Sequence, residues 1–251
     1  MSSKLTWVVS FLTVEDVSAG YGSLQIINGV SLKAQPNQIT VIVGPNGSGK
    51  STLLKTIAGL TNIYRGQVTI DGRIISNLAP HEIARLGIAY LPQTESTFTQ
   101  LTVAENFKMA GYTVARNDFE DRKMRVLEIF PRLSSYMKTK VFHLSGGERQ
   151  MVAMSMALLR KPNTIMFDEP TANLSPMLAT EVLNTITYLA KDSDITILLV
   201  EQNATRALQI GHSAYLLVNG TTIFEGSAKS LLEHPELGKL YLGLTVPQPS
   251  S

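Results

Sequence analysis

Residues 44–52 read GPNGSGKST and fit the phosphate-binding pattern G-x-x-x-x-G-K-[ST]. Glycines let backbone N–H groups approach a phosphate, and a helix that begins directly after the loop adds partial positive charge at its N-terminus. In this pattern the lysine neutralises the β- and γ-phosphates and the hydroxyl holds Mg²⁺, roles that fall to Lys50 and Ser51. We therefore expect a site for a nucleoside triphosphate formed by Gly44, Pro45, Asn46, Gly47, Ser48, Gly49, Lys50, Ser51 and Thr52.

A second segment with chemical potential ends in two adjacent carboxylates. Thr164–Pro170 reads TIMFDEP, an apolar run that places Asp168 and Glu169 at the tip of a buried strand. The carboxyl ends of strands are where α/β sheets bind ligands. There Asp168 would hold Mg²⁺ through its water shell, and Glu169 would orient or deprotonate the attacking water. Taken alone, two adjacent acids are more often an ordinary solvated turn, so the catalytic interpretation depends on the other motifs of the chain.

These motifs need a scaffold, and the periodicity of the chain predicts one. β-Branched and alternating runs predict strands at residues 12–17, 25–32, 38–43, 66–70, 87–91, 164–167, 196–201, 214–218 and 221–225. Helical patterns fall at residues 50–59, 79–85, 102–112, 118–130, 146–160, 176–191 and 203–211. Turn and capping signals separate these elements: Asp71-Gly72, Asn219-Gly220, Thr102 with Glu105, and Ser175 before Pro176.

The order of these elements predicts an interrupted α/β domain. Residues from about 94 to 145 hold helical patterns and no convincing strand, whereas strands and helices alternate on either side. We expect a single nucleotide-binding domain over residues 1–251. Its α/β catalytic core, with a β subdomain, would comprise residues 1–93 and 150–251, and residues 94–149 would form an inserted helical subdomain.

Residues 144–150 read LSGGERQ, which resembles the signature of ATP-binding-cassette (ABC) ATPases. The chain is similar over nearly its whole length to the nucleotide-binding subunits of ABC transporters. The resemblance implies an α/β fold with a P-loop (RecA-like) core, an antiparallel β subdomain and an inserted α-helical subdomain. It also implies a dimer in which each ATP, bound to one subunit, is contacted by the other subunit's Leu144, Ser145, Gly146, Gly147 and Glu148. The alternative for Ser145–Gly147 is a simple helix start, since serine and glycine are good caps.

Two single positions also match motifs of this family. Tyr21, in AGYG, matches the aromatic residue that stacks on adenine, and Gln93, in YLPQ, matches the glutamine that senses magnesium and connects the core to the helical lobe. The alternatives are a surface aromatic for Tyr21 and a loop amide for Gln93. The resemblance thus implies ATP and Mg²⁺ as cofactors, with Ser51, Gln93 and Asp168 as the metal-binding set.

Two departures from the family pattern are informative. Ser175 stands where most members carry an aspartate, in the loop that joins the two sites across the dimer. Gln202 stands where most carry a histidine that contacts the γ-phosphate. A glutamine amide can donate a hydrogen bond but cannot become cationic or shuttle a proton. We expect Gln202 at the catalytic site with a weaker electrostatic effect than histidine, and His212 on the surface.

This combination resembles the smaller ATPase subunit of importers for branched-chain amino acids (leucine, isoleucine, valine). The ending Leu237–Leu244 is also similar to that branch, whereas Leu91-Pro92-Gln93 replaces the PEG that its members often carry. The resemblance implies ATP-driven uptake with transmembrane permease subunits and an extracytoplasmic substrate-binding protein. A second ABC ATPase subunit would complete a heterodimer, or a second copy of this chain a homodimer.

Other interpretations stay open. A lipid- or polysaccharide-type ABC exporter is less favoured, because its ATPase usually keeps the histidine that Gln202 replaces. An ATP-gated, weakly hydrolysing structural partner is favoured by Gln202 and Ser175 and opposed by Glu169. For the permease contact, Phe98, Leu101 and Phe107 are candidates for an apolar groove that receives a permease helix, with packing inside the helical lobe as the alternative for each.

Composition excludes several classes of protein. The net charge is +2 with acidic and basic residues interspersed, which gives no signal for nucleic acid. The chain has no cysteine, which excludes disulfides and thiolate chemistry and suits the cytoplasm. No run approaches the roughly 20 apolar residues that span a bilayer, and Leu5–Val14 alternates like a strand rather than a signal peptide. We expect a cytoplasmic protein, peripheral on the inner face of the cell membrane.

Overall fold

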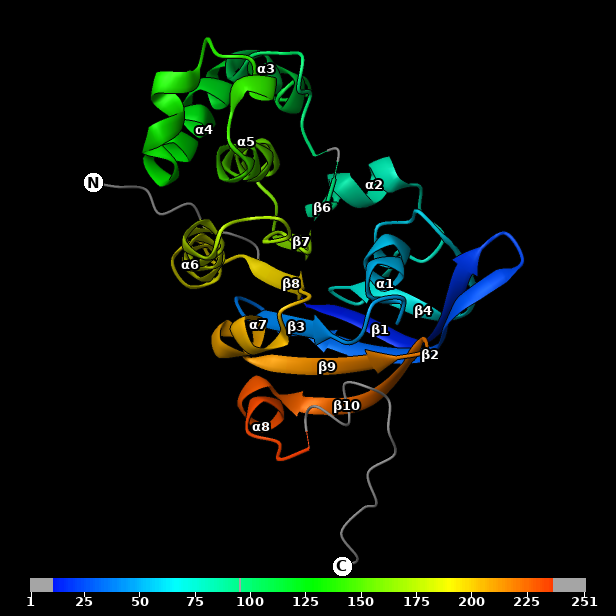
Figure 1. The fold of residues 1–251 in the computed structure, drawn as a ribbon. Helices are drawn as coiled ribbons and strands as arrows, with labels where there is room; N and C mark the ends of the chain where they lie inside the picture. The colour runs from blue at the N-terminus through cyan, green and yellow to red at the C-terminus, as the bar shows by residue number, and fades with distance from the viewer. Residues whose placement is uncertain (1–10, 95, 237–251) are drawn as a thin grey trace, which may run out of the picture.

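The computed structural model describes residues 11–94 and 96–236 of the chain. Most of the strand expected at Leu5–Val14 and all of the ending Leu237–Leu244 lie outside the described residues. Within them the chain is an α/β protein with two sheets, as expected. Figure 1 shows a group of helices at the top of the view, above the strands of both sheets: α3 (Val103–Ala110), α4 (Arg116–Ile129) and α5 (Gly146–Leu159).

The larger sheet contains β7, the strand that ends at the expected site residue Asp168. Its six strands lie in the order β10-β9-β3-β8-β7-β6, and every neighbouring pair is parallel except β9 with β10. Strands β3, β7 and β8 are buried along their whole length, since both faces of the sheet are covered. The strands are β3 (Ile39–Val43), β6 (Ile88–Leu91), β7 (Thr164–Asp168), β8 (Thr196–Val200), β9 (Ser213–Val218) and β10 (Thr221–Ser227).

Alternate residues of these strands enter two separate hydrophobic cores. In β3, Val41 and Val43 join the core under the long helices, whereas Ile42 joins the core beneath α1 and the second sheet. The first core is covered by α5 (Gly146–Leu159), α6 (Pro176–Asp192), α7 (Ala204–Ile210) and α8 (Ala228–Leu232). The second is covered by α1 (Lys50–Ile57) and α2 (Pro80–Arg85). The sheet is therefore held between two layers.

The second sheet is antiparallel, with the order β2-β1-β4-β5. Both expected hairpin turns are present: Asp71-Gly72 joins β4 to β5 in this sheet, and Asn219-Gly220 joins β9 to β10 in the larger sheet. All four residues have the positive φ that two-residue hairpin loops require, at 51°, 77°, 48° and 76°. The strands are β1 (Leu12–Tyr21), β2 (Leu24–Ala34), β4 (Asn62–Ile70) and β5 (Arg73–Ile74).

Helices make up the regular structure between Gln93 and α5. This stretch contains α3 (Val103–Ala110), α4 (Arg116–Ile129) and 3₁₀ turns at Pro131–Tyr136 and Val141–His143. The expected capping box is formed: the Thr102 hydroxyl accepts from the Glu105 N–H at 3.2 Å, and the Glu105 carboxylate accepts from the Thr102 N–H at 2.7 Å. None of the helices within residues 11–94 and 96–236 is long and apolar enough to cross a membrane.

Candidate functional site

The phosphate-loop residues join β3 to the N-terminus of α1, as the sequence predicts. Gly44 has φ 151°, and a Cβ there would lie 2.0 Å from the Leu217 carbonyl oxygen, so no other residue fits. Helix α1 begins at Lys50 without a side-chain cap and without an acidic residue in its first turn. The N–H groups of that turn therefore keep the arrangement that binds anions.

Two buried polar groups of the loop fit a phosphate ligand. Lys50 is 4% exposed, and its Nζ donates to the carbonyl oxygens of Gly44 at 2.8 Å and Pro45 at 2.9 Å. Burial lowers the pKa of Lys50, while the nearby Glu169 and Asp168 act against that shift. The Ser48 hydroxyl is buried and has no hydrogen-bond partner among the described residues. A phosphate oxygen would satisfy such a group.

Asp168 connects the phosphate loop to the end of β7. Its Oδ1 accepts a hydrogen bond from the Ser51 hydroxyl at 2.8 Å, and its Oδ2 accepts one from the Tyr90 hydroxyl at 2.9 Å. Burial and the Asp168 carboxylate raise the pKa of Tyr90 well above its usual range, so Tyr90 remains a donor. Sequence reasoning missed Tyr90, because only the pairing of β6 with β7 brings it beside Asp168.

Glu169, Gln93 and Gln202 gather at the same edge of the sheet. The Gln93 amide donates to the Glu169 carboxylate at 3.1 Å, and the Glu169 N–H donates to the Val200 carbonyl at 2.9 Å. Gln202 follows the end of β8, which lies between β3 and β7. The structure thus brings Lys50, Ser51, Asp168, Glu169, Gln93 and Gln202 to the carboxyl ends of adjacent strands, which is where such sheets bind ligands.

A second residue that sequence reasoning missed is Glu201. It is 2% exposed, directly before Gln202, and accepts a hydrogen bond from the Thr171 N–H at 3.0 Å. Burial raises the pKa of Glu201, and hydrogen bonds from Thr171 and Gln202 act against that shift. The sequence placed Glu201 at a strand end, but nothing in the sequence shows that its carboxyl group is buried.

The signature residues begin α5 and lie apart from the phosphate loop of the same chain. The Ser145 hydroxyl accepts from the Glu148 N–H at 3.4 Å, and the Glu148 carboxylate accepts from the Ser145 N–H at 2.7 Å. Leu144 and Gly147 are buried, and a Cβ on Gly147 would lie 2.9 Å from Leu178 Cδ2. Figure 1 shows α5 and α1 on opposite sides of β6 and β7. The segment therefore does start a helix, as the simpler interpretation predicted.

The remaining candidates are placed as follows. Tyr21 is 43% exposed at the end of β1, and Asn46 and Gly47 are exposed at the tip of the phosphate loop. Ser175 caps α6, where its hydroxyl accepts from the Leu178 N–H at 3.4 Å. His212 is exposed, as expected, and its Nδ1 accepts from the Ile39 N–H at 3.1 Å, at the opposite end of β3 from the loop.

The donor set at Ser51 and Asp168 suits magnesium. Within residues 11–94 and 96–236, no group of three or more His, Cys, Asp or Glu side chains could hold a metal ion without help. Magnesium is usually bound by one or two carboxylates together with substrate phosphates, rather than by a complete protein cage. A hydroxyl and a carboxylate beside a phosphate loop therefore fit this metal.

Comparison with known proteins gives the class of this chain. Residues 27–172 match the family model described as ABC transporter, so the chain belongs to the ABC transporter family and is an ATPase of the ATP-binding-cassette type. It is 52% identical to the probable branched-chain amino acid transport ATP-binding protein LivF of Archaeoglobus fulgidus, covering 91% of this chain and 97% of that protein. It is 33% identical to the lipopolysaccharide export system ATP-binding protein LptB of Haemophilus influenzae, covering 94% and 98%.

Solved structures confirm the fold. The ADP conformation of an ATP-binding cassette of an ABC transporter matches with a TM-score of 0.83 and 29% identity, over 94% of this chain and all of that chain. The fold expected from the sequence, an α/β P-loop cassette with an antiparallel sheet and a helical insertion, is therefore correct.

Proposed function

We propose that this chain is the ATP-hydrolysing subunit of an importer for branched-chain amino acids. The observation that carries the proposal is the similarity to LivF over nearly the whole chain, which exceeds the similarity to the lipopolysaccharide exporter subunit. The site supports the ATP-hydrolysing part of the proposal, since the groups that phosphoryl transfer needs lie at one edge of the sheet.

Each residue of the site has a role in this proposal. Lys50 neutralises the β- and γ-phosphates of ATP, and Ser51 and Asp168, with Gln93, hold Mg²⁺. When bound, Mg²⁺ neutralises charge that develops on the phosphate oxygens. Glu169 orients or deprotonates the attacking water, and its hydrogen bond to Gln93 fixes the carboxylate. Gln202 donates to the γ-phosphate from the end of β8, and Tyr21 stacks on the adenine.

The position of the signature calls for a second cassette subunit. Ser145, Gly146 and Gly147 lie at the start of α5, whereas the phosphate loop of the same chain precedes α1, and Figure 1 shows β6 and β7 between these two helices. They would therefore reach the γ-phosphate held by a partner, either a second copy of this chain or a different ABC ATPase. ATP binding then closes the dimer, and hydrolysis lets it reopen.

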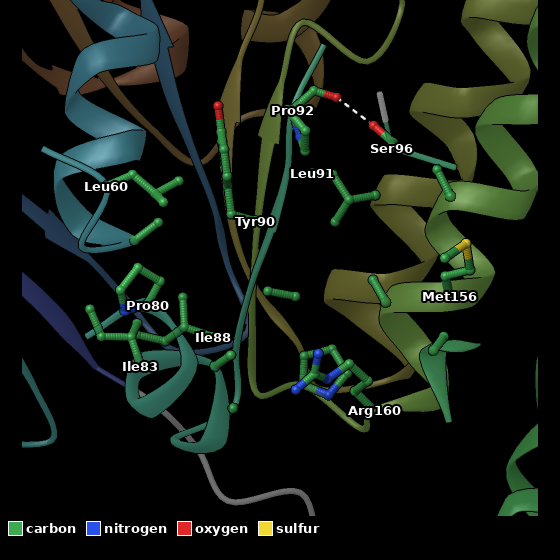
Figure 2. Close-up of a pocket in the computed structure, with 18 of the residues that line it drawn as sticks. Leu60, Pro80, Ile83, Ile88, Tyr90, Leu91, Pro92, Ser96, Met156 and Arg160 are labelled. Atoms are coloured by element: carbon green, nitrogen blue, oxygen red, sulfur yellow. Dashed lines mark hydrogen bonds between the residues drawn. The ribbon is translucent and has the colours of Figure 1, made fainter. Parts of the chain in front are cut away.

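A groove beside the site is our candidate for the contact with a permease subunit. It has a volume of about 400 Å³ and runs between α2 and β6 on one side and α5 on the other. Figure 2 shows Leu60, Pro80, Ile83 and Ile88 on one wall and Met156 on the facing wall, with Pro92 and Ser96 at one end.

Of the three candidates for such a groove, one lines it. Phe98 lines it and is 50% exposed. Phe107 is fully buried in the first core, so it is excluded as a groove residue and the alternative, packing inside the helical lobe, is correct. Leu101 is half-buried and is not among the lining residues. Phe98, with Met109 and Met156, is therefore our candidate for the permease contact.

This assembly places the protein on the inner face of the cell membrane, held there by the permease subunits. The extracytoplasmic substrate-binding protein acts on it only through those subunits. Nucleic acid has no part in the proposed function, because the charges of the chain are balanced and interspersed.

Gln202 favours a second candidate function, an ATP-gated subunit whose partner performs most of the hydrolysis. A neutral donor supplies less electrostatic stabilisation than a cationic histidine. The two candidates differ in which subunit's glutamate limits the rate. In an assembled heterodimer, Glu169→Gln should abolish most ATP hydrolysis if this chain is the motor, and should change it little if the partner is.

The first test of the proposal is ATP hydrolysis and leucine uptake by cells that carry either the natural chain or Glu169→Gln as the only copy. We expect the variant to lose both activities and, with ATP, to accumulate a dimer visible by size-exclusion chromatography. Uptake of leucine, isoleucine and valine that persists in cells without the chain would refute the assigned cargo.

A further inference from the structure

The buried carboxyl group of Glu201, on the segment that carries Gln202, contacts the segment that carries Glu169. Glu201 is 2% exposed, and none of the ion pairs formed by the described residues involves it. A buried polar group destabilises the fold unless hydrogen bonds compensate. Glu201 must therefore accept hydrogen bonds, and the donors of those bonds are the groups that it holds in place.

These bonds come from two different segments. The Thr171 N–H donates to Oε1 of Glu201 at 3.0 Å, and the Thr171 hydroxyl and the Gln202 N–H also donate to the carboxylate. Residue 170 is proline and has no N–H. The N–H of Thr171 is therefore the first backbone donor after Glu169, and Glu201 is its acceptor.

The turn held in this way has an unusual backbone. Glu169 has φ 50°, a conformation that non-glycine residues adopt only when their surroundings impose it. Its N–H donates to the Val200 carbonyl at 2.9 Å, and its carbonyl accepts from the Ala172 N–H at 3.1 Å. The bond from Thr171 to Glu201 fixes the other side of the turn. Without that bond, the turn would no longer be held where it continues into the loop of residues 171–175.

We propose that Glu201 is a positioning residue for ATP hydrolysis. It holds the Glu169 turn and Gln202 in a fixed relation, and it does so as a hydrogen-bond acceptor rather than as a charge. In the proposed function Glu169 orients the attacking water and Gln202 donates to the γ-phosphate. A shift of either residue would therefore misplace the reacting groups. This inference rests on the ATPase activity proposed above and is independent of the transported cargo.

Two substitutions distinguish the role of the Glu201 carboxylate as a hydrogen-bond acceptor from the role of its charge. Glu201→Gln keeps a carbonyl oxygen at the same reach without the charge, whereas Glu201→Asp keeps the charge but withdraws the acceptor by one methylene. We expect Glu201→Asp to lower kcat by about ten- to a hundredfold, the effect of misplacing reacting groups by about 1 Å. The KM for ATP should stay nearly constant, because the phosphate loop is untouched. Glu201→Gln should recover most of the lost rate.

The control is Glu225→Asp, which shortens a carboxylate that accepts from the Tyr215 hydroxyl at 3.0 Å, away from the site. It should leave kcat unchanged. All variants are measured as full chains in the same assembled complex. A Glu201→Asp variant with unchanged kcat would overturn the proposal, and so would a Glu201→Gln variant as slow as Glu201→Asp.

Hydrogen exchange supplies a readout that does not depend on turnover. In Glu201→Asp the Thr171 amide should exchange faster than in the natural chain, while amides of α1 exchange at the same rate. Unchanged exchange at Thr171 would overturn the positioning role even in a complex that hydrolyses no ATP. Absence of hydrolysis by the natural chain would instead count against the proposed function.

Discussion

At the scale of single residues, the site is organised around hydrogen bonds to two carboxylates. Asp168 receives the hydroxyls of Ser51 and Tyr90, one on each oxygen. Glu169 receives the amide of Gln93. Groups that orient a metal ligand typically contribute ten- to a hundredfold in metal affinity. The residues around these carboxylates should therefore affect the magnesium requirement as well as the rate.

Tyr90 offers the most direct test of this point. Tyr90→Phe removes the donor to Asp168 and keeps the ring, so the magnesium concentration for half-maximal ATP hydrolysis should rise by about tenfold. Tyr64→Phe is the matched control, because its hydroxyl donates to the Gly22 carbonyl at 2.8 Å, away from Asp168. A magnesium titration of both variants decides the matter. Equal magnesium requirements in the two variants would show that Tyr90 does not orient Asp168.

Glu201 also makes a prediction about pH. Its pKa in the folded protein lies above the ordinary value of 4.5 because of burial and the nearby Glu169. Between pH 4.5 and that raised pKa, the folded protein binds more protons than the unfolded chain, so this group makes folding less favourable as pH rises. The free energy of unfolding of Glu201→Gln, relative to the natural chain, should therefore increase as pH rises through this window and then level off. Urea unfolding of both proteins from pH 4.5 upward measures this difference in free energy of unfolding. A difference that falls as pH rises would contradict a raised pKa for Glu201.

At the scale of elements, Ser175 fixes the start of α6. Its hydroxyl caps α6 by accepting from the Leu178 N–H, and Pro176 occupies the first turn. Ser175→Ala should lower the free energy of unfolding by about 1 kcal/mol. Ser175→Asp should restore it, since aspartate also caps helices. Denaturation of the isolated chain checks both values, and a Ser175→Asp variant as unstable as Ser175→Ala would mean that capping is not the role of this residue.

The elements themselves were largely predictable, because their signals are local. The capping box of Thr102 and Glu105, the hairpin turns and the phosphate loop each depend on residues close in sequence, and the structure has them where the sequence placed them. Short elements such as β5 and α8 were missed, since two and five residues carry too little periodicity. Tyr90 and Glu201 were missed for a different reason. Their contacts depend on strand pairing and burial, which are set by the whole sheet.

At the scale of the whole molecule, the fold separates three tasks. The carboxyl edge of the large sheet carries the residues proposed to bind and hydrolyse ATP, α5 begins with the residues proposed to contact a partner's ATP, and the groove lies between β6 and α5. The residues on either side of Gln93 contribute to two of these regions. Gln93 bonds Glu169, while Pro92, Ser96 and Phe98 line the groove. A movement of this short segment would therefore be felt both at the catalytic carboxylate and at the groove.

Phe98 tests whether the groove couples hydrolysis to transport. Phe98→Asp places a charge on a half-exposed wall of the groove, where it would oppose the docking of an apolar permease helix. ATP hydrolysis by the isolated chain should be unchanged, because Phe98 lines the groove and does not line the pocket that contains Gln93 and Glu169. Leucine uptake by the reconstituted complex should fall by at least about tenfold, as expected for the loss of one interface anchor of a few kcal/mol.

The matched control is Tyr112→Asp, which adds the same charge at a side chain that is 87% exposed and does not line the groove. It should leave both hydrolysis and uptake unchanged. If Phe98→Asp transports like the natural complex, the groove is not the permease contact. If hydrolysis by the isolated chain falls together with uptake by the reconstituted complex, the substitution has disturbed the path from Phe98 to Gln93 and the catalytic site itself. Only a loss of uptake with intact hydrolysis identifies the groove as the place where the two are joined.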